Sequence, residues 1–384
     1  MASRRERCRW CNVYLVVPAE AQSFTCPRCQ NITQVPFPHY NPFSHARESV
    51  NHAANQVAGL INMVTTHIST KTSSVNSQHG AGNYCSHQPP RPSLPLPSVH
   101  GRKRAVICGL NYRGRSYKVK GSINDANCMR YLLVEKFGFP STCVVMLTED
   151  ETNPLRIPTK ANMRLALKWL VQGCEPGDSL VFHFSGHGSR QRDYNMDEID
   201  GFDEALCPLD FETEGSIVND EINDTIVRPL TSGVTLHAII DACYSETVLD
   251  LPFICRMDRK GYYTWEDQRC SRAYKGTSGG LAISFSACND DQISMDTTAL
   301  AGNASTGALT FSFIQSVQNE PGLSYGRLLN AMRGAIRGVK ASGLRLNGPI
   351  ASLVNKALFN TEIDQEPQLS SSSKFDVYSK QFML

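Results

Sequence analysis

A cysteine and a histidine in this chain each follow an apolar segment with the length of a buried strand. His187 stands between two glycines just after residues 179–185, and Cys243 follows residues 234–241. A thiol with a pKa of about 8.5 is mostly protonated at neutral pH, so its attack on a carbonyl carbon needs a nearby imidazole to take the proton. The pair therefore predicts a cysteine nucleophile, Cys243, with His187 as its base.

Such an attack creates an oxyanion that needs hydrogen-bond donors. The backbone N–H groups of Gly188 and Cys243 are the candidates. The alternative interpretation is that Cys243 is a buried structural thiol and His187 a loop histidine. The placement of both residues at strand ends favours catalysis.

The elements that must position this pair begin near residue 104. Five apolar segments read as strands: 104–110, 143–147, 179–185, 234–241 and 281–287. Segments with helical periodicity alternate with them: 124–137, 159–172, where Thr159 can cap the helix, 308–318 and 323–339. This alternation predicts an α/β fold with about six mainly parallel strands, flanked by helices. Catalytic groups in such sheets lie beyond the carboxyl ends of the strands.

Four of the fourteen cysteines form a separate pattern near the N-terminus. Two Cys-x2-Cys pairs, Cys8 with Cys11 and Cys26 with Cys29, are typical of a tetrahedral structural zinc site. A redox Cys-x-x-Cys role is the alternative, but it does not need a second pair. The other ten cysteines are scattered and do not suggest a disulfide framework.

The bulk composition is that of an ordinary globular protein. The chain has 384 residues, 41% hydrophobic and 19% charged, with a formal net charge of +2. This balance gives no global indication of nucleic-acid or membrane binding. The first residues lack the apolar core of a secretory signal, and no apolar run reaches membrane-spanning length. We therefore expect a cytoplasmic or nuclear protein.

Composition also predicts the domain organisation. Residues 1–35 form a zinc-binding module, and the Pro-, Ser- and Asn-rich stretch 36–103 is a linker prodomain. The catalytic part divides into a large region, 104–260, a short loop, 261–280, and a small region, 281–384.

Four stretches together resemble a metacaspase: SGHGS at 185–189, DGFDEALCPLDFETEGSIVNDEI at 200–222, DACYS at 241–245 and CNDDQISMDT at 288–297. The short loop between the two regions is similar to the type I arrangement. The N-terminal cysteine pattern resembles the lesion-simulating-disease-type zinc finger of plant members. The resemblance implies a caspase-like fold, a monomer, calcium activation and a zymogen that cleaves itself. It also implies a role in stress or programmed cell death.

The resemblance further implies cleavage of protein substrates after Arg or Lys. A basic P1 side chain needs buried or half-buried carboxylates opposite it. Asp241 lies on the same strand face as Cys243, and Asp125 matches the position of the second pocket carboxylate. Ser185 is the third expected substrate-binding residue. Asp241 could instead brace a loop.

By the same resemblance, four residues occupy the positions of the activating calcium site: Asp203, Asn219, Asp220 and Asp250. Their oxygens suit calcium. The family usually has an aspartate at the position of Asn219, so the lost charge should weaken the site. A solvated acidic surface is the alternative for such charge runs, and Asp197 and Glu198 are assigned to it.

The sequence also leads to expectations for Glu246 and Lys275. Glu246 stands where the family usually has glycine, which should strain the backbone and place a carboxylate near the oxyanion. Lys275 lies in a loop rich in small residues that we expect to be exposed and cleaved during processing. Lys260, Arg269 and Arg272 are alternative processing sites.

Two functions follow. The first is a calcium-dependent cysteine endopeptidase. The alternative is a weakly active or inactive homologue that regulates partners through its zinc finger. We expect this zinc finger to bind a protein and not DNA.

Overall fold

The chain divides into two compact units, Met1–Ser49 and Val50–Leu384. The computed structural model describes residues 3–7, 14–18, 23–25, 28, 32–34, 102–269, 274–287, 296–301, 304–320, 322–341 and 366–384. In the first unit, β1 (Ser3–Arg7) pairs antiparallel with β2 (Tyr14–Pro18), and β3 (Ser23–Thr25) with β4 (Ile32–Gln34). Cys8, Cys11, Cys26 and Cys29 lie outside the described residues.

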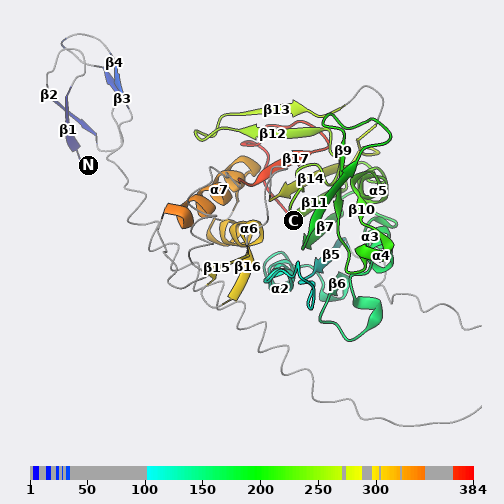
Figure 1. Ribbon diagram of the computed structural model, residues 1–384. Helices are drawn as coiled ribbons and strands as arrows, with labels where there is room; N and C mark the ends of the chain where they lie inside the picture. Colours follow the sequence, from blue (N-terminus) through cyan, green and yellow to red (C-terminus); the bar gives the residue numbers. More distant parts are fainter. Residues whose placement is uncertain are drawn as a thin grey trace, which may run out of the picture. The chain divides into compact units, whose positions relative to one another are not determined.

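The second unit is built on an eight-stranded sheet (Figure 1). Five parallel strands form its main part in the order β14 (Leu281–Ser286), β11 (Thr235–Asp241), β7 (Ser179–Ser185), β5 (Lys103–Gly109) and β6 (Val144–Thr148). Beyond β14 the sheet continues antiparallel, with β17 (Gln368–Ser371), β12 (Phe253–Met257) and β13 (Tyr263–Asp267). The predicted mainly parallel sheet is confirmed, and the expected number of about six strands was too low.

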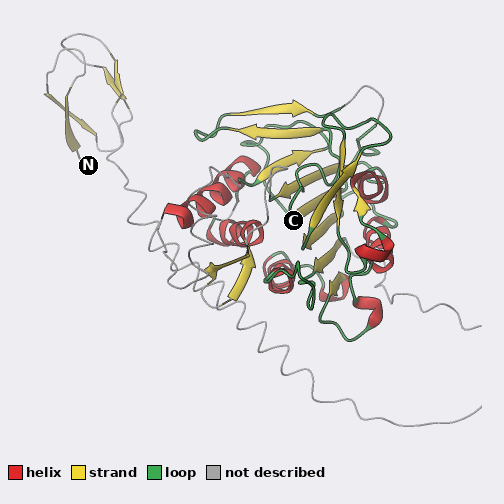
Figure 2. Cartoon of the chain, in the orientation of Figure 1, coloured by secondary structure: helices red, strands yellow, loops and turns green. Residues whose placement is uncertain are grey.

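Helices cover both faces of this sheet (Figure 2). One face packs on α2 (Ser122–Tyr131), η1 (Leu132–Lys136), α6 (Ala308–Asn319) and α7 (Tyr325–Ala341). The other packs on α3 (Lys160–Val171), α5 (Asn219–Ile222) and η4 (Asn223–Val227). Side chains alternate along each strand, so that Phe182 and Phe184 enter one core and Val181 the other. Both cores are apolar, which is why these strands read as continuous apolar runs.

The smaller elements lie around this framework. A three-stranded antiparallel sheet consists of β8 (Gly188–Arg192), β9 (Phe202–Leu206) and β10 (Ile217–Val218). β15 (Asp296–Ala301) pairs with β16 (Ala304–Gly307). Three short helical turns complete the description: η2 (Ser141–Cys143), η3 (Pro154–Arg156) and α4 (Phe211–Glu214).

All five predicted strands and all four predicted helices are present, with ends shifted by a few residues. Thr159 caps α3 as expected, because its hydroxyl accepts from the N–H of Asn162. The antiparallel edge was missed. β13 is only partly buried, and β17 is short and carries two serines, so neither gives a strong apolar signal.

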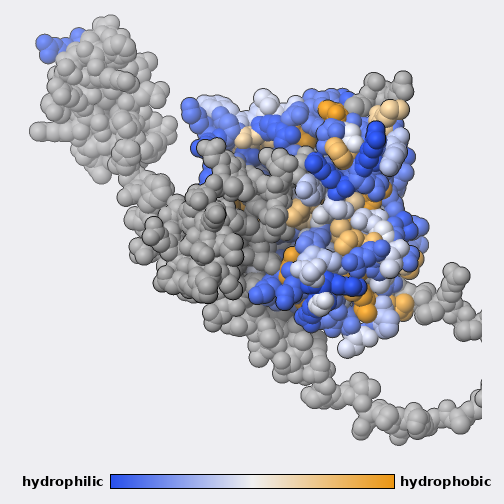
Figure 3. Space-filling model, viewed as in Figure 1, coloured by the Kyte–Doolittle hydropathy of each residue, from blue (hydrophilic) through white to orange (hydrophobic). Residues whose placement is uncertain are grey.

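The face of the molecule seen in Figure 3 is mostly hydrophilic, with hydrophobic residues scattered among polar ones. Within the described residues, no helix has both the length and the apolar character required to cross a bilayer.

Candidate active site

The sheet brings the segments of the predicted catalytic pair into contact. Asp241 and Ser185 are register partners at the ends of β11 and β7. The N–H of Gly186 donates to the carbonyl of Asp241 at 3.2 Å. On the other side of His187, Gly188 packs so closely on the next strand end that an added Cβ would lie 1.9 Å from the carbonyl oxygen of Cys243. Glycine at 188 is therefore required for the two loops to meet.

The imidazole of His187 has a defined orientation. Its Nε2 lies 2.6 Å from the backbone carbonyl oxygen of Tyr117. A carbonyl can only accept a hydrogen bond, so Nε2 carries the proton and Nδ1 keeps its lone pair in the neutral ring. The Tyr117 carbonyl therefore holds the base in the tautomer that can accept a proton at Nδ1.

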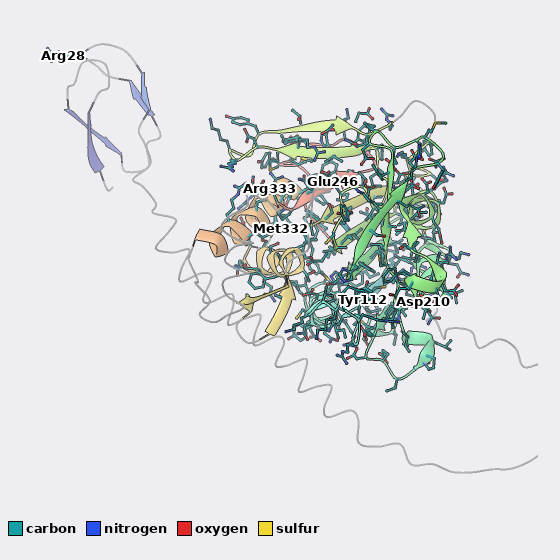
Figure 4. All side chains as sticks on the ribbon, in the orientation of Figure 1. Arg28, Tyr112, Asp210, Glu246, Met332 and Arg333 are labelled. Carbon is teal, nitrogen blue, oxygen red and sulfur yellow. The ribbon has the colours of Figure 1, made fainter. Side chains whose placement is uncertain are left out.

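Tyr112, labelled in Figure 4, packs against the same histidine. Its ring lies 4.6 Å from the imidazole, centroid to centroid. Its hydroxyl accepts from the N–H of His187 at 3.0 Å and donates to the carbonyl of Cys207 at 2.6 Å. Burial raises the pKa of this phenol well above its ordinary value. Sequence reasoning missed both tyrosines, although Tyr112 follows β5 and lies in a strand-end loop, where the rule for parallel sheets directs attention.

Cys243 is 8% exposed and stands at the start of the loop after β11. Tyr244 and Asp250 have positive φ in this loop, at 49° and 51°, and Glu246 is not in the left-handed region. The carboxylate of Glu246, labelled in Figure 4, pairs with the guanidinium of Arg256. The expected backbone strain at Glu246 was wrong, and this ion pair engages the carboxylate that was expected near the oxyanion.

The predicted pocket residues lie together on the α2–α6 face of the sheet. The hydroxyl of Ser185 donates to Asp125 at 2.8 Å, and the N–H of Thr310 donates to Asp241 at 2.8 Å. The N–H of Gly307 donates to both Asp125 oxygens at 3.0 and 3.1 Å. A Cβ added to Gly307 would lie 2.2 Å from an Asp241 oxygen and 2.9 Å from an Asp125 oxygen. One glycine therefore touches both carboxylates.

The two carboxyl groups share a strongly unfavourable environment for charge. Burial, and then the neighbouring Asp241, raise the pKa of Asp125 to about 8. Burial likewise raises the pKa of Asp241. Within the described residues, the hydrogen-bond donors to this pair are neutral groups. The pair therefore lacks a cation there, and a charged guanidinium or ammonium from outside would favour its ionised form.

A second acidic cluster lies around Asp250, seven residues after the nucleophile. One carboxylate oxygen from each of three residues lies within 4.8 Å of the others in two sets: Asp193, Asp197 and Asp203, and Asp197, Asp220 and Asp250. The structure therefore brings Asp203, Asp220 and Asp250 to one region. Burial, and then Asp197, raise the pKa of Asp220 to about 6.

Asp197 and Glu198 belong to this cluster, so their assignment to a solvated surface was wrong. Both side chains are more than nine-tenths buried. Burial, and then Asp250, raise the pKa of Glu198 to about 8. Asn219 is fully buried, and its amide donates to Glu198 at 2.8 Å while its oxygen accepts from the N–H of Asp220. Asn219 thus orients one carboxylate of the cluster.

The cluster contains one buried cation. The Nζ of Lys275 lies 2.6 Å from Asp250, 2.9 Å from Glu198 and 3.8 Å from Asp197. Burial alone would lower the pKa of Lys275, and the carboxylates of Asp250 and Glu198 outweigh burial and raise it. Lys275 is 2% exposed. The expectation that it lies exposed in a loop was wrong, because its charge is drawn inward by the carboxylates.

The donor set of the cluster fits a calcium ion. It offers several carboxylate oxygens, which are the ligands that calcium prefers. Two of these oxygens, Oδ1 of Asp197 and Oδ1 of Asp203, are buried without a hydrogen-bond partner among the described residues. Buried oxygens of this kind are costly unless something binds them.

The sequence was compared with those of known protein families and proteins. Residues 103–252 match the family model of the metacaspase, peptidase C14 domain. The chain is 50% identical to metacaspase-1 of Arabidopsis thaliana over 98% of its length and 95% of the relative. It is 50% identical to metacaspase-3 of the same plant, with 100% of both chains covered, and 51% identical to metacaspase-2 over 75% of this chain and 74% of the relative.

These matches cover both the His187 and the Cys243 segment. They confirm the predicted caspase-like α/β fold and the predicted family. The chain belongs to the metacaspase family of cysteine peptidases.

Proposed function

We propose that this metacaspase is a calcium-dependent endopeptidase that cleaves protein substrates after Arg or Lys, with Cys243 as nucleophile and His187 as base. One observation supports the basic preference above all others. Asp125 and Asp241 form a buried carboxyl pair at the end of the strand that leads to Cys243, and their donors among the described residues are neutral. A P1 guanidinium or ammonium would supply the missing positive charge.

The proposed reaction begins with the proton of the Cys243 thiol. Nδ1 of His187 accepts that proton while Sγ attacks the scissile carbonyl carbon. The N–H groups of Gly188 and Cys243 are proposed to stabilise the oxyanion. The imidazolium then protonates the leaving amine, the peptide C–N bond breaks, and water hydrolyses the thioester. The Tyr117 carbonyl and the Tyr112 hydroxyl keep the ring in place throughout these steps.

The residues proposed to hold calcium are Asp203, Asp220 and Asp250, together with Asp197, whose carboxylate lies within 4.8 Å of theirs. A bound calcium ion would neutralise the mutual repulsion of these carboxylates. Asp250 belongs to the same loop as Cys243, and the amide of Asn223 fixes that loop by donating to the carbonyls of Leu249 and Asp250. A well-ordered acidic cluster would therefore help to hold the loop that carries Cys243 in position.

The deciding experiment uses the purified full chain and fluorogenic peptides that end in Arg, Lys or Asp. We expect cleavage of the first two in millimolar calcium, none after a chelator, and none in Cys243→Ala. Equal cleavage of the Asp peptide would contradict the pocket assignment. Activity that survives the chelator would contradict calcium dependence and leave the nucleophile assignment intact.

We also propose that the N-terminal unit is a structural zinc module. Each Cys-x2-Cys pair falls, in sequence, between two strands that pair with each other, β1 with β2 and β3 with β4. This arrangement suits a site in which two chain turns supply four thiolates. Elemental analysis of the purified protein should give one zinc per chain, and the Cys8→Ser variant should lose it. The monomeric state and a role in cell death stay predictions from the family resemblance, and the partner of this module and cytoplasmic or nuclear residence stay predictions from the sequence.

A further inference from the structure

Lys275 places a buried ammonium inside the cluster that we propose to bind calcium. Its Nζ lies 2.6 Å from Oδ1 of Asp250 and 2.9 Å from Oε1 of Glu198, and its side chain is 1% exposed. Most lysines lie at the surface, since burying an ammonium is unfavourable unless carboxylates surround it. The cluster therefore already contains a cation of its own.

This ammonium and a calcium ion would compete for the same oxygens. Calcium binds its oxygen ligands at about 2.3–2.6 Å, and the Asp250 oxygen already lies 2.6 Å from Nζ. Two cations at one carboxylate oxygen would repel each other strongly in a buried site. Occupancy of the cluster by calcium therefore requires the ammonium to leave.

The backbone around Lys275 is suited to such a release. Its side chain points inward, while the neighbouring Tyr274 is 64% exposed. Before the bond, Nδ2 of Asn223 lies 3.5 Å from the carbonyl of Lys275, and Arg228 donates to the carbonyl of Tyr274. After it, the N–H and the hydroxyl of Ser278 donate to the carbonyl of Arg228. With its ion pairs to Asp250 and Glu198 gone, the Lys275–Gly276 bond would lie in a short loop between these contacts, which can open to enter a protease active site.

We propose that Lys275 is the internal counter-ion of the calcium site, and that calcium binding expels its side chain and exposes the Lys275–Gly276 bond to cleavage. The proposal rests on the proposed calcium dependence and adds its mechanism. In the calcium-free chain the lysine balances the carboxylates and is itself protected. In the calcium-bound chain it becomes an accessible basic P1 residue, the type of residue that the Asp125–Asp241 pocket is proposed to accept.

The first test measures calcium affinity by isothermal titration in the Cys243→Ala background, where self-cleavage cannot occur. Lys275→Met removes the competing cation and should tighten calcium binding about tenfold or more. Lys275→Arg keeps a competing cation and should bind like the parent. Lys260→Met, a change to an exposed lysine in the turn between β12 and β13, controls for net charge and should also match the parent. Equal affinity in Lys275→Met and the parent would overturn the proposal.

The second test detects expulsion directly, because removing a positive charge could tighten calcium binding without any movement. Cys243→Ala is treated briefly with trypsin, with and without calcium, and the fragments are identified by mass spectrometry. Cleavage after Lys275 should appear only with calcium, while cleavage after Lys260 should be the same in both. Protection of the Lys275–Gly276 bond at saturating calcium would rule out expulsion.

The two proposals fail in different ways. Calcium binding that activates the enzyme, together with an unmoved and protected Lys275, contradicts the inference and leaves the proposed function standing. Absence of calcium binding in both the parent and Lys275→Met contradicts the calcium part of both. Circular dichroism of each variant shows that it is folded, and Lys275→Arg provides a folded comparison if Lys275→Met is unstable.

Discussion

Two clusters of buried carboxylates flank the nucleophile in sequence, and their charges are balanced in opposite ways. Asp241, two residues before Cys243, faces Asp125 among neutral donors. Asp250, seven residues after Cys243, forms an ion pair with the buried ammonium of Lys275. Among the described residues the first cluster lacks a cation, which we propose a substrate supplies, and the second contains one, which we propose calcium replaces. Under these proposals the first cluster serves substrate recognition and the second serves control of activity.

The largest expected effect is at the first cluster. Asp241→Asn should lower kcat/KM for Arg and Lys peptides about 10³-fold, because one partner of a buried charge pair with the substrate is lost. Its thermal midpoint should not fall, since the substitution removes a buried charge that has no cation among the described residues. Asp376→Asn, an exposed carboxylate bound to Ser379, is the control. A stable variant with full activity would show that Asp241 only braces its loop.

At the second cluster, removing a charge should destabilise the protein. Lys275→Met should lower the free energy of unfolding of the calcium-free protein by about 3 kcal/mol, because it leaves buried carboxylates uncompensated. Urea unfolding in the presence of a chelator measures this change. Calcium should restore most of the loss. An unchanged free energy of unfolding would mean that the ammonium does not stabilise the cluster.

A substitution at Gly307 tests how tightly this glycine packs against the two carboxylates of the first cluster. Gly307→Ala places a Cβ 2.2 Å from an Asp241 oxygen, so the pocket must distort and kcat/KM should fall about 100-fold. Gly334→Ala in α7, where an added Cβ meets nothing within 4 Å, should leave activity unchanged. Comparable activity in the two variants would contradict the tight fit at Gly307.

The pH dependence of activity should test the first cluster through Asp125. The folded protein holds the proton of Asp125 up to about pH 8, whereas an unfolded chain releases it near pH 4. Stability from this group is therefore present at low pH and falls as pH rises toward 8. Binding of a basic P1 group needs the ionised form, so kcat/KM should rise about fivefold between pH 7 and 8. A pH–rate profile with Asp125→Asn should lack this rise; an identical profile would assign it to another group.

The smallest effect is expected at Glu246. Its carboxylate is paired with Arg256, so Glu246→Gln should change kcat/KM by less than about threefold. A larger rise in turnover on an Arg peptide would restore the idea that this carboxylate opposes the oxyanion.

The sequence by itself determined the framework and the placement of the chemistry at its edge. Apolar runs of strand length that alternate with helical segments favour a parallel sheet covered on both faces. That sheet put Asp241 and Ser185 side by side in register. The spacing of the glycines around His187 also fixed where the loops could meet.

The tertiary structure alone decided which polar groups are partners. Tyr117 orients His187 through a backbone carbonyl, which no residue type can signal. Lys275 and Asp250 are far apart in sequence, and an acidic run with a distant lysine looks the same whether it is solvated or buried. Local sequence records where a charge is, and only the folded chain determines whether water or another charge surrounds it.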